Sequence, residues 1–434
     1  ALVWLAARRL ASPGAALVSG ALVALSRAPL FYSTNPDKTA LVLFLTALAF
    51  ACAAWAAGAS RAGRWALTGA AVGVAALAHP LLLVILPAIA VHLFASRRSL
   101  RHALFLTGVC GLSALLVLAP AAIRNALRGG GLVLVCSNGG HNLYIGNHLG
   151  NATGQYTSPP FSQANIQEEE ARFRAEAERR AGRALSASEV SAFWTRQALD
   201  EMGQVPGRSA ARMLRKLRWV LNEEELTDTR TYDFYTARLT PIRLLPWNFG
   251  VLALLGGLGA ALVVRDRRLV LPVAFSALYA VALAVFFVYG RYRLPLAVPL
   301  SVLAGALLSR APALARAMRR RDLALSGAAV AAAAVYVFGP VLPGVEVSWF
   351  PDFYNQGNRY LRAGRIDMAL VEYEKAITVR PGDHPHVAAT AAWVIDTRMQ
   401  SGDRDGAARV LVEALAVRPG DPQLLARTGL LRQR

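Results

Sequence analysis

The sequence predicts an all-α protein: a polytopic bundle of membrane helices, a mostly helical extracytoplasmic loop and a C-terminal α-solenoid. Hydrophobic residues make up 55% of the 434 residues and charged residues 17%, which is too apolar for an ordinary soluble chain. The apolar residues gather in long runs, and the segment after them carries a helical repeat. We divide the chain into membrane helices over 1–123, a loop domain over 124–243, membrane helices over 244–343 and a repeat domain over 344–434.

Nine apolar runs could cross a bilayer. They lie at about 12–26, 39–57, 65–79, 81–96, 103–122, 244–264, 269–289, 294–309 and 325–343. A span needs roughly 20 apolar residues, and fewer when it is buried among other helices. Gly and Ala crowd these runs, as expected where membrane helices approach closely.

The chain has a net charge of +20, and its Lys and Arg residues are unevenly distributed between the loops on the two sides of these runs. Fifteen Lys and Arg residues fall in one set of short loops, and four, Arg27, Lys38, Arg291 and Arg293, fall in the alternate set. Because cations accumulate on the cytoplasmic side, we expect the first set to be cytoplasmic. The loop 124–243 and the tail 344–434 then lie outside the cytoplasm. The charge indicates topology, and we predict no nucleic-acid partner.

The three Cys residues and the start of the chain add two expectations. Cys52 and Cys110 lie inside apolar runs, so a secreted disulfide scaffold is excluded. The apolar run before Arg8 and Arg9 is too short to cross a bilayer. We therefore expect residue 1 to lie inside a helix, in a chain truncated by one or two spans.

The predicted loop domain begins with residues suited to turns and polar contacts. A strand-like run, Leu132–Val135, precedes a stretch rich in Asn and Gly, in which Asn-Gly and Gly-Gly pairs indicate tight turns. Within it, Asn138, Asn142, Tyr144 and Asn147 could bind a polyhydroxylated substrate without charge. The alternative is that these residues only shape the backbone.

Three helices should follow in the loop. The segment Glu168–Arg183 is typical of a solvated helix. Ser186 and Glu189 have the spacing of a capping box, which predicts a helix through about Met202. Pro206 should begin a basic helix that ends near Trp219. That helix could lie along lipid headgroups or present a solvated face with one aromatic anchor.

The tail carries the pattern of tetratricopeptide repeats, in which small residues lie where two helices touch. The matching positions are Phe353, Gly357, Tyr360, Gly364, Ala369, Tyr373, Ala376 and Pro381, and four of them recur 38 residues later as Gly402, Ala407, Ala414 and Pro419. Asp383–His386 is the expected insertion, and a third repeat begins at Asp421. Such helices form a concave surface for a peptide or a partner protein. His384 and His386 lack further ligands at a zinc spacing, so we predict no metal site.

Four motifs in the first 340 residues occur in a recognisable order. They are Pro29–Tyr32 before Asp37, Gly69–Pro87 with His79-Pro80 at a helix junction, Pro120–Asn125 followed by Ser137–Asn147, and Arg291–Pro295. Together they resemble the C-type membrane glycosyltransferases of the protein-mannosyltransferase-like and aminoarabinose-transferase-like superfamily. His79 departs from the pattern, because many relatives carry Arg or Lys there.

The resemblance implies an enzyme of the bacterial inner membrane that moves a sugar from a polyprenyl-phosphate donor to a protein or lipid acceptor outside the cytoplasm. Arg124 and the Asn-rich stretch would contact the substrate. Arg291 and Arg293 would bind the lipid phosphate, since Arg forks match phosphate oxygens in pairs. The alternative for this pair is snorkelling at a helix end.

The resemblance also implies a carboxylate base that deprotonates the acceptor. In such enzymes the base lies in the first outer loop, which would precede residue 1, so we expect the chain as given to be inactive. Asp37 is then an auxiliary acid or base, and Lys38 would offset the charge of the leaving phosphate. Alternatively, Asp37 only begins a helix. No cofactor is firmly implied, and a divalent metal is left open.

Other functions explain the sequence less well. A transporter would favour ionisable residues inside the spans, and the runs hold almost none beyond His79 and His92. A membrane-anchored scaffold does not require nine spans. A polysaccharide ligase or polymerase can also carry tail repeats and is the runner-up.

Overall fold

The computed structural model describes residues 1–34, 37–58, 61–96, 99–128, 131, 133–162, 166–226, 230–264, 266–341, 348–379, 381 and 386–432. Several residues named above lie outside these ranges, among them Leu132 and Asp383–Pro385. The chain divides into two compact units, one of Ala1–Leu226 with Leu244–Val341 and the other of Thr227–Arg243 with Leu342–Arg434.

The regular secondary structure described in the first unit is helical. Its elements are α1 (Leu2–Leu10), α2 (Pro13–Ala24), α3 (Arg27–Ser33), α4 (Thr39–Ala57), α5 (Ala62–Ala78), η1 (Pro80–Val84), α6 (Ile85–Ala95), α7 (Leu100–Leu127), α8 (Gly139–Asn147), α9 (Ile166–Ala181), α10 (Ala187–Gln204), α11 (Pro206–Leu221), α14 (Phe249–Ala260), η2 (Ala261–Val264), η3 (Arg267–Leu269), α15 (Val270–Val285), α16 (Gly290–Arg293), η4 (Leu294–Leu296), α17 (Ala297–Ala317) and α18 (Arg320–Phe338). The described residues contain no strand, only an isolated bridge between Ser26 and Trp247. The helical part of the prediction is confirmed.

Among the residues that the structure describes, five helical segments are long and apolar enough to cross a membrane. They are Thr39–Ala57, Leu100–Leu127, Arg267–Val285, Gly290–Ala317 and Arg320–Phe338. Four shorter apolar helices, Pro13–Ala24, Ala62–Ala78, Pro80–Ala95 and Phe249–Ala260, coincide with the other predicted runs. These helices indicate an integral membrane protein.

Glycine residues set the distances between several of these helices. A Cβ on Gly69 in α5 would lie 2.0 Å from the carbonyl oxygen of Cys110 in α7. A Cβ on Gly259 in α14 would lie 2.3 Å from the carbonyl oxygen of Leu303 in α17. The backbones can approach this closely only because no side chain intervenes, which is the role predicted for small residues in these runs.

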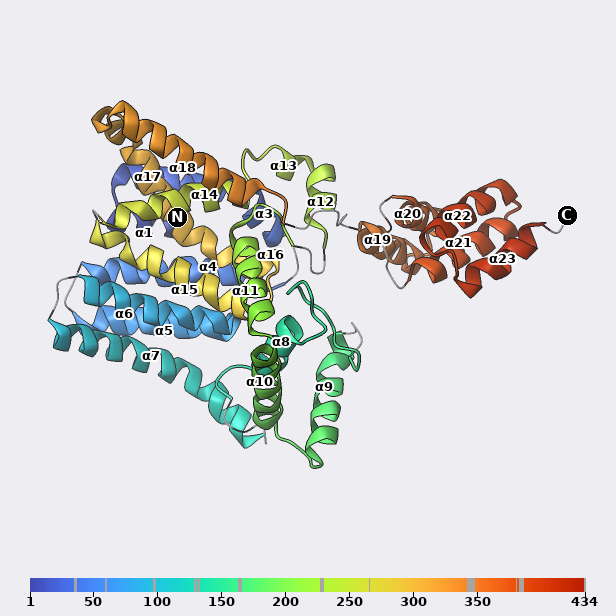
Figure 1. The fold of residues 1–434 in the computed structure, drawn as a ribbon, viewed down its shortest axis with the longest axis horizontal. Coiled ribbons are helices and arrows are strands. Elements are labelled where there is room, and N and C mark those ends of the chain that lie inside the picture. The colour runs from blue at the N-terminus through green and yellow to red at the C-terminus, as the bar shows by residue number, and fades with distance from the viewer. Residues whose placement is uncertain are drawn as a thin grey trace. The chain divides into compact units, whose positions relative to one another are not determined.

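Helices α8 to α11 gather beside one end of the bundle (Figure 1). Helix α10 begins where the capping box predicts, because Ser186 accepts from the backbone of Glu189 and the Glu189 carboxylate accepts from the backbone of Ser186. Helix α11 begins at Pro206 as predicted. The Trp219 ring is fully buried within the protein, so it does not lie at the headgroups, and of the two alternatives for this helix the solvated face with one aromatic anchor fits better.

The Asn- and Gly-rich stretch differs from its prediction. Residues 133–135 form no strand, and the expected tight turns are replaced by helix α8. Its glycines serve close contacts instead: a Cβ on Gly140 would lie 1.9 Å from the carbonyl oxygen of Ser191 in α10, and one on Gly146 would lie 2.2 Å from that of Phe286. Tertiary packing therefore outweighs the low helix propensity of this segment.

The second unit consists of helices α12 (Tyr232–Arg238), α13 (Thr240–Arg243), α19 (Phe350–Arg362), α20 (Ile366–Thr378), α21 (Val387–Gln400), α22 (Arg404–Val417) and α23 (Pro422–Arg432). Helix α19 packs on α20, and α21 packs on α22. Asp352 in α19 accepts a hydrogen bond from the Thr231 backbone, and Phe234 in α12 packs on Phe353. Residues 230–243, which the sequence groups with the loop domain, thus pack with the tail helices.

Equivalent positions of the two repeats share their environments. Ala369 and Ala407 are fully buried, and so are Ala376 and Ala414. Gly364 and Gly402 both end a helix with positive φ, at 72° and 83°. Glycine adopts this backbone conformation without the steric cost of a Cβ, so both turns use it for the same reason.

Candidate functional site

A cavity of about 600 Å³ lies in the first unit, where several helix ends meet. Its lining comes from the start of α4, the junction of α5 and η1, residues 135–142, the end of α15 and the short helix α16. The lining residues are Lys38, Thr39, Val42, Leu77, His79, Pro80, Leu81, Val135, Cys136, Asn138, Gly139, Asn142, Leu283, Phe286, Phe287, Arg291 and Tyr292. The volume is that of a typical small-molecule site.

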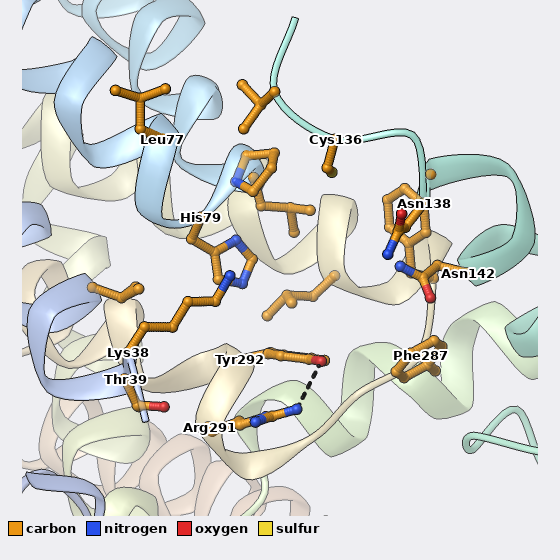
Figure 2. Close-up of a pocket in the computed structure, with 17 residues that line it drawn as sticks. Lys38, Thr39, Leu77, His79, Cys136, Asn138, Asn142, Phe287, Arg291 and Tyr292 are labelled. Atoms are coloured by element: carbon orange, nitrogen blue, oxygen red, sulfur yellow. Dashed lines mark hydrogen bonds between the residues drawn. The ribbon is translucent and has the colours of Figure 1, made fainter. Parts of the chain in front are cut away.

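One side of the cavity is cationic. Figure 2 shows Lys38 and Arg291 there, near His79 and Tyr292. The Arg291 guanidinium donates to the Tyr292 hydroxyl at 3.2 Å and lies over the Tyr292 ring. The ring of His79 meets that of Tyr292 edge-on, with centroids 5.6 Å apart. Two basic side chains in one cavity can bind an anionic group such as a phosphate.

Asp37 lies beside this cationic side. Its Oδ1 accepts a hydrogen bond from the backbone of Thr39 at 2.7 Å, so it satisfies a donor at the start of α4. Its Oδ2 lies 4.0 Å from Nη1 of Arg291. One carboxylate oxygen of Asp37 therefore serves the start of α4, and the other faces a cation of the cavity.

The other side of the cavity is lined by amides and aromatic rings. Asn138 and Asn142 lie at the beginning of α8, and Phe287 lies near them in Figure 2. The side-chain amide of Asn142 has no hydrogen-bond partner among the described residues. The close contacts of Gly140 and Gly146 fix α8 against α10 and Phe286, and so fix these amides at the cavity.

Helix α8 separates the predicted loop residues into two groups. Asn138 and Asn142, four residues apart, share the face that lines the cavity, whereas Tyr144 and Asn147 lie on a buried face. A helix has this effect because its side chains repeat every 3.6 residues. From the sequence we expected a loop in this stretch, and we therefore did not predict that these residues would lie on two different faces.

Tyr144 and Asn147 lie inside the loop core. The Tyr144 hydroxyl donates to Glu201 at 3.1 Å, and burial together with that carboxylate raises the pKa of Tyr144 to about 12. Asn147 donates to the carbonyl oxygens of Leu143 and Val285 and accepts from Lys216 at 2.9 Å. Neither side chain lines the cavity.

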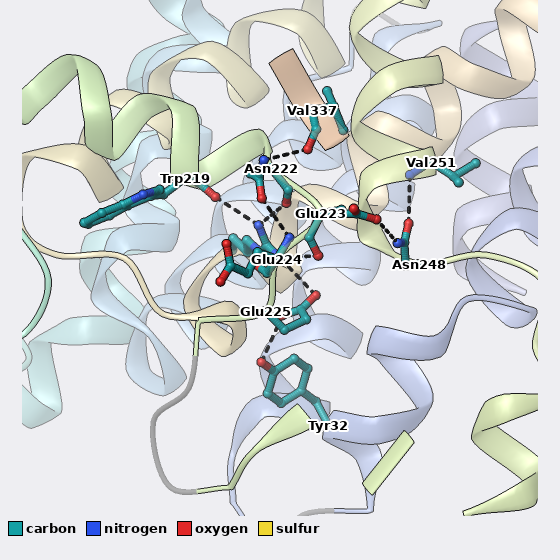
Figure 3. A network of polar contacts seen from close by, with 10 residues as sticks. Tyr32, Trp219, Asn222, Glu223, Glu224, Glu225, Asn248, Val251 and Val337 are labelled. Atoms are coloured by element: carbon teal, nitrogen blue, oxygen red, sulfur yellow. Dashed lines mark hydrogen bonds and ion pairs between the residues drawn. The ribbon is translucent and has the colours of Figure 1, made fainter. Parts of the chain in front are cut away.

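Arg124 and Arg293 also lie apart from the cavity lining. Arg124 is exposed at the end of α7 and contacts Asn125 at 3.3 Å. Arg293 is 1% exposed and donates to the carbonyl oxygens of four residues that Figure 3 labels, Trp219, Asn222, Glu223 and Glu224. Arg291 and Arg293 are two residues apart on a helix, and such residues do not share a face. The structure therefore separates the pair that the sequence joined.

The segment that surrounds Arg293 was not singled out from the sequence. Residues 222–226 link α11 to the second unit, and Glu225 forms an ion pair with Arg293 at 3.1 Å. Tyr32 donates to the same carboxylate at 3.1 Å, and Asn222 donates to the carbonyl oxygens of Val337 and Gly339. The sequence feature that could have identified this segment is its acidic run, which directly follows the basic helix α11.

Two further features bear on chemistry. Lys216 in α11 is fully buried, and burial, with a smaller effect from Arg212, lowers the pKa of Lys216 to about 7. Within the part of the chain that the structure describes, no group of three or more His, Cys, Asp or Glu residues is placed to hold a metal ion.

Comparison with known protein families gives a match over the first helices of the chain. A family model described as dolichyl-phosphate-mannose-protein mannosyltransferase matches residues 1–123, which include Lys38 and His79 of the cavity. No curated protein and no solved structure matches the chain. The match supports the glycosyltransferase superfamily, and the apolar helices indicate an integral membrane protein.

Proposed function

We propose that the chain is a membrane glycosyltransferase that moves a sugar from a polyprenyl-phosphate donor to a protein or lipid acceptor outside the cytoplasm. The observation that carries the proposal is the cavity, in which Lys38 and Arg291 lie together with Asn138 and Asn142. Leu77, which is 43% exposed on α5, also lines it. The cavity thus offers cations for a phosphate, amides for a sugar and an apolar flank for a lipid.

In this proposal Lys38 and Arg291 bind the donor phosphate. The acceptor oxygen forms a bond to the anomeric carbon, the bond from that carbon to the phosphate oxygen breaks, and polyprenyl phosphate leaves. The acceptor proton passes to a carboxylate base, with Asp37 assisting or holding Arg291 in place. Negative charge grows on the phosphate as it leaves, so fixed cations stabilise the transition state more than the ground state.

Binding of polyprenyl phosphate by the full chain in nanodiscs tests the proposal. Each charge-assisted hydrogen bond contributes about 1.5–3 kcal/mol, so Lys38→Ala with Arg291→Ala should weaken binding at least tenfold. Arg128→Ala, which removes an exposed cation at the end of α7, is the control and should bind as wild type does. Equal affinity in all three proteins would support a scaffold and contradict the enzyme.

The proposed orientation places the loop and the tail outside the cytoplasm of a bacterial inner membrane. It rests on the excess of cations in the opposite loops. Cys136 is exposed in the loop, so a membrane-impermeant thiol reagent should label it in intact spheroplasts. Labelling that requires lysis would reverse the orientation.

The tail is proposed to be a tetratricopeptide domain that binds an acceptor or a partner protein. The shared burial of Ala369 with Ala407, the matching turns at Gly364 and Gly402 and the helix pairs α19–α20 and α21–α22 support this. Pull-down of cell-envelope proteins by the full chain and by a chain without 350–434 is the test. A partner retained by both would contradict a role for the repeats.

A further inference from the structure

The charge of the cavity lining has a consequence for the sugar. Lys38 and Arg291 are basic residues, whereas none of the described lining residues is Asp or Glu. Asp37, the carboxylate beside Lys38, is engaged with the Thr39 backbone and Arg291 and is not part of the lining. A bound phosphate would offset the cations at one side only.

The opposite side offers neutral hydrogen-bonding groups. Each Asn amide has an oxygen that accepts and a nitrogen that donates, and a sugar hydroxyl can do both. Asn142 has no side-chain partner among the residues that the structure describes, and Asn138 contacts Ser137 only through its oxygen, at 3.5 Å. Phe287 and Tyr292 add ring surface, with centroids 6.1 Å apart.

We infer that the cavity selects a donor whose sugar is an uncharged, hydroxyl-rich ring and discriminates against a cationic amino sugar, with Asn142 as a specificity-determining residue. The inference rests on the proposed function and specifies the substrate class of that site. An ammonium group on the ring would enter a cavity that already holds two cations and no lining carboxylate. Its repulsion grows as water is excluded, because the effective dielectric constant falls.

Cys136 provides a direct measure of occupancy. It is exposed and lines the cavity, whereas Cys110 is buried and Cys52 is half-buried in α4. A bound donor should therefore slow the reaction of Cys136 with a thiol reagent. Cys136→Ser gives the background labelling of the other two thiols.

The experiment compares three lipids on the full chain in nanodiscs: polyprenyl phosphate, polyprenyl-phosphate hexose and polyprenyl-phosphate amino sugar of similar size. We expect the hexose lipid to protect Cys136 at a concentration at least tenfold lower than the amino-sugar lipid. Asn142→Asp adds a carboxylate to the lining and should narrow or reverse this ratio. Asn142→Gln keeps a neutral amide and should preserve the preference, which shows that the folded cavity remains.

The outcomes distinguish a failure of the sugar preference from a failure of the proposed function. If sugar-free polyprenyl phosphate protects Cys136 but the amino-sugar lipid protects as well as the hexose lipid, the sugar inference is overturned and the phosphate site stands. An unchanged ratio in Asn142→Asp also overturns the inference. If no lipid protects Cys136, the proposed function falls together with the inference.

Discussion

The guanidinium of Arg293 lies 3.1 Å from the carboxylate of Glu225, and both side chains are almost completely buried. The pair joins α16, which carries Arg291 of the cavity, to the segment that follows α11. Tyr32 donates to the same carboxylate (Figure 3), and four backbone carbonyl oxygens, those of Trp219, Asn222, Glu223 and Glu224, accept from Arg293. Arg293 therefore has a positioning role, because it fixes α16, the helix from which the Arg291 side chain extends to the cavity.

Removal of Arg293 should destabilise the first unit. Arg293→Ala leaves Glu225 as an unpaired buried carboxylate, and breaking a buried pair in this way costs about 3–5 kcal/mol. We expect a lower Tm in detergent, partly restored when Glu225→Gln is added. Arg291→Ala, two residues away and partly exposed, is the control and should retain the Tm while donor binding weakens. A wild-type Tm for Arg293→Ala would show that the pair is dispensable.

Two adjacent glycines test the position of α8. A Cβ on Gly140 would meet the Ser191 backbone, whereas a Cβ on Gly139 meets nothing within 4 Å. Gly140→Ala should therefore displace α8 from α10 and lower the Tm by several degrees, and Gly139→Ala should leave it unchanged. Thermal unfolding of the two variants is the measurement. Equal Tm values would mean that α8 is not held by this contact.

Asp37 can be assigned by comparing two substitutions. Asn keeps an oxygen that accepts from the Thr39 backbone, so Asp37→Asn should preserve this hydrogen bond, whereas Asp37→Ala should lose about 0.5–1.5 kcal/mol of stability. If the carboxylate assists proton transfer, both variants should lower kcat. The measurement uses a form of the protein that transfers sugar from the lipid donor to an acceptor. Full kcat in Asp37→Asn would restrict Asp37 to the helix start.

Lys216 should make stability depend on pH. Its pKa in the folded protein is about 7, below the ordinary value of about 10.4 in an unfolded chain. Between these values the unfolded state binds the extra proton, so stability rises with pH, by at most about 1.4 kcal/mol per pH unit. Below pH 7 both states are protonated and this contribution is flat.

The pH series needs a matched variant, because other groups titrate in the same range. Lys216→Met removes the titratable amino group and keeps an unbranched side chain of similar length. The difference in Tm between wild type and Lys216→Met should change between pH 7 and pH 10 and stay constant below pH 6. A difference that is constant over the whole range would show that Lys216 keeps its ordinary pKa.

The helices could be predicted because their signals are local. Apolar runs located the nine hydrophobic segments, the Ser186 capping box located the start of α10, and Pro206 located the start of α11. The small residues also fulfilled their expected role between spans, at Gly69 for example. Each of these features depends on residues a few positions apart, or on the general demand for close helix contact.

The division of polar residues between cavity and core could not be predicted. Asn142 and Asn147 have the same side chain and lie five residues apart, yet one lines the cavity and the other binds Lys216. The difference depends on α8 being helical, and that depends on contacts of Gly140 and Gly146 with distant segments. Likewise, nothing next to Arg293 in the sequence indicates that residues 219–225 enclose its guanidinium.

The position of the donor phosphate tests the central claim most directly. A cryo-EM map of the full chain in nanodiscs, with a polyprenyl-phosphonate sugar that cannot react, would locate it. We predict that the phosphonate lies within hydrogen-bonding distance of Lys38 and Arg291, with its sugar toward Asn138 and Asn142. A phosphonate bound elsewhere on the protein, with this cavity empty, would contradict the account.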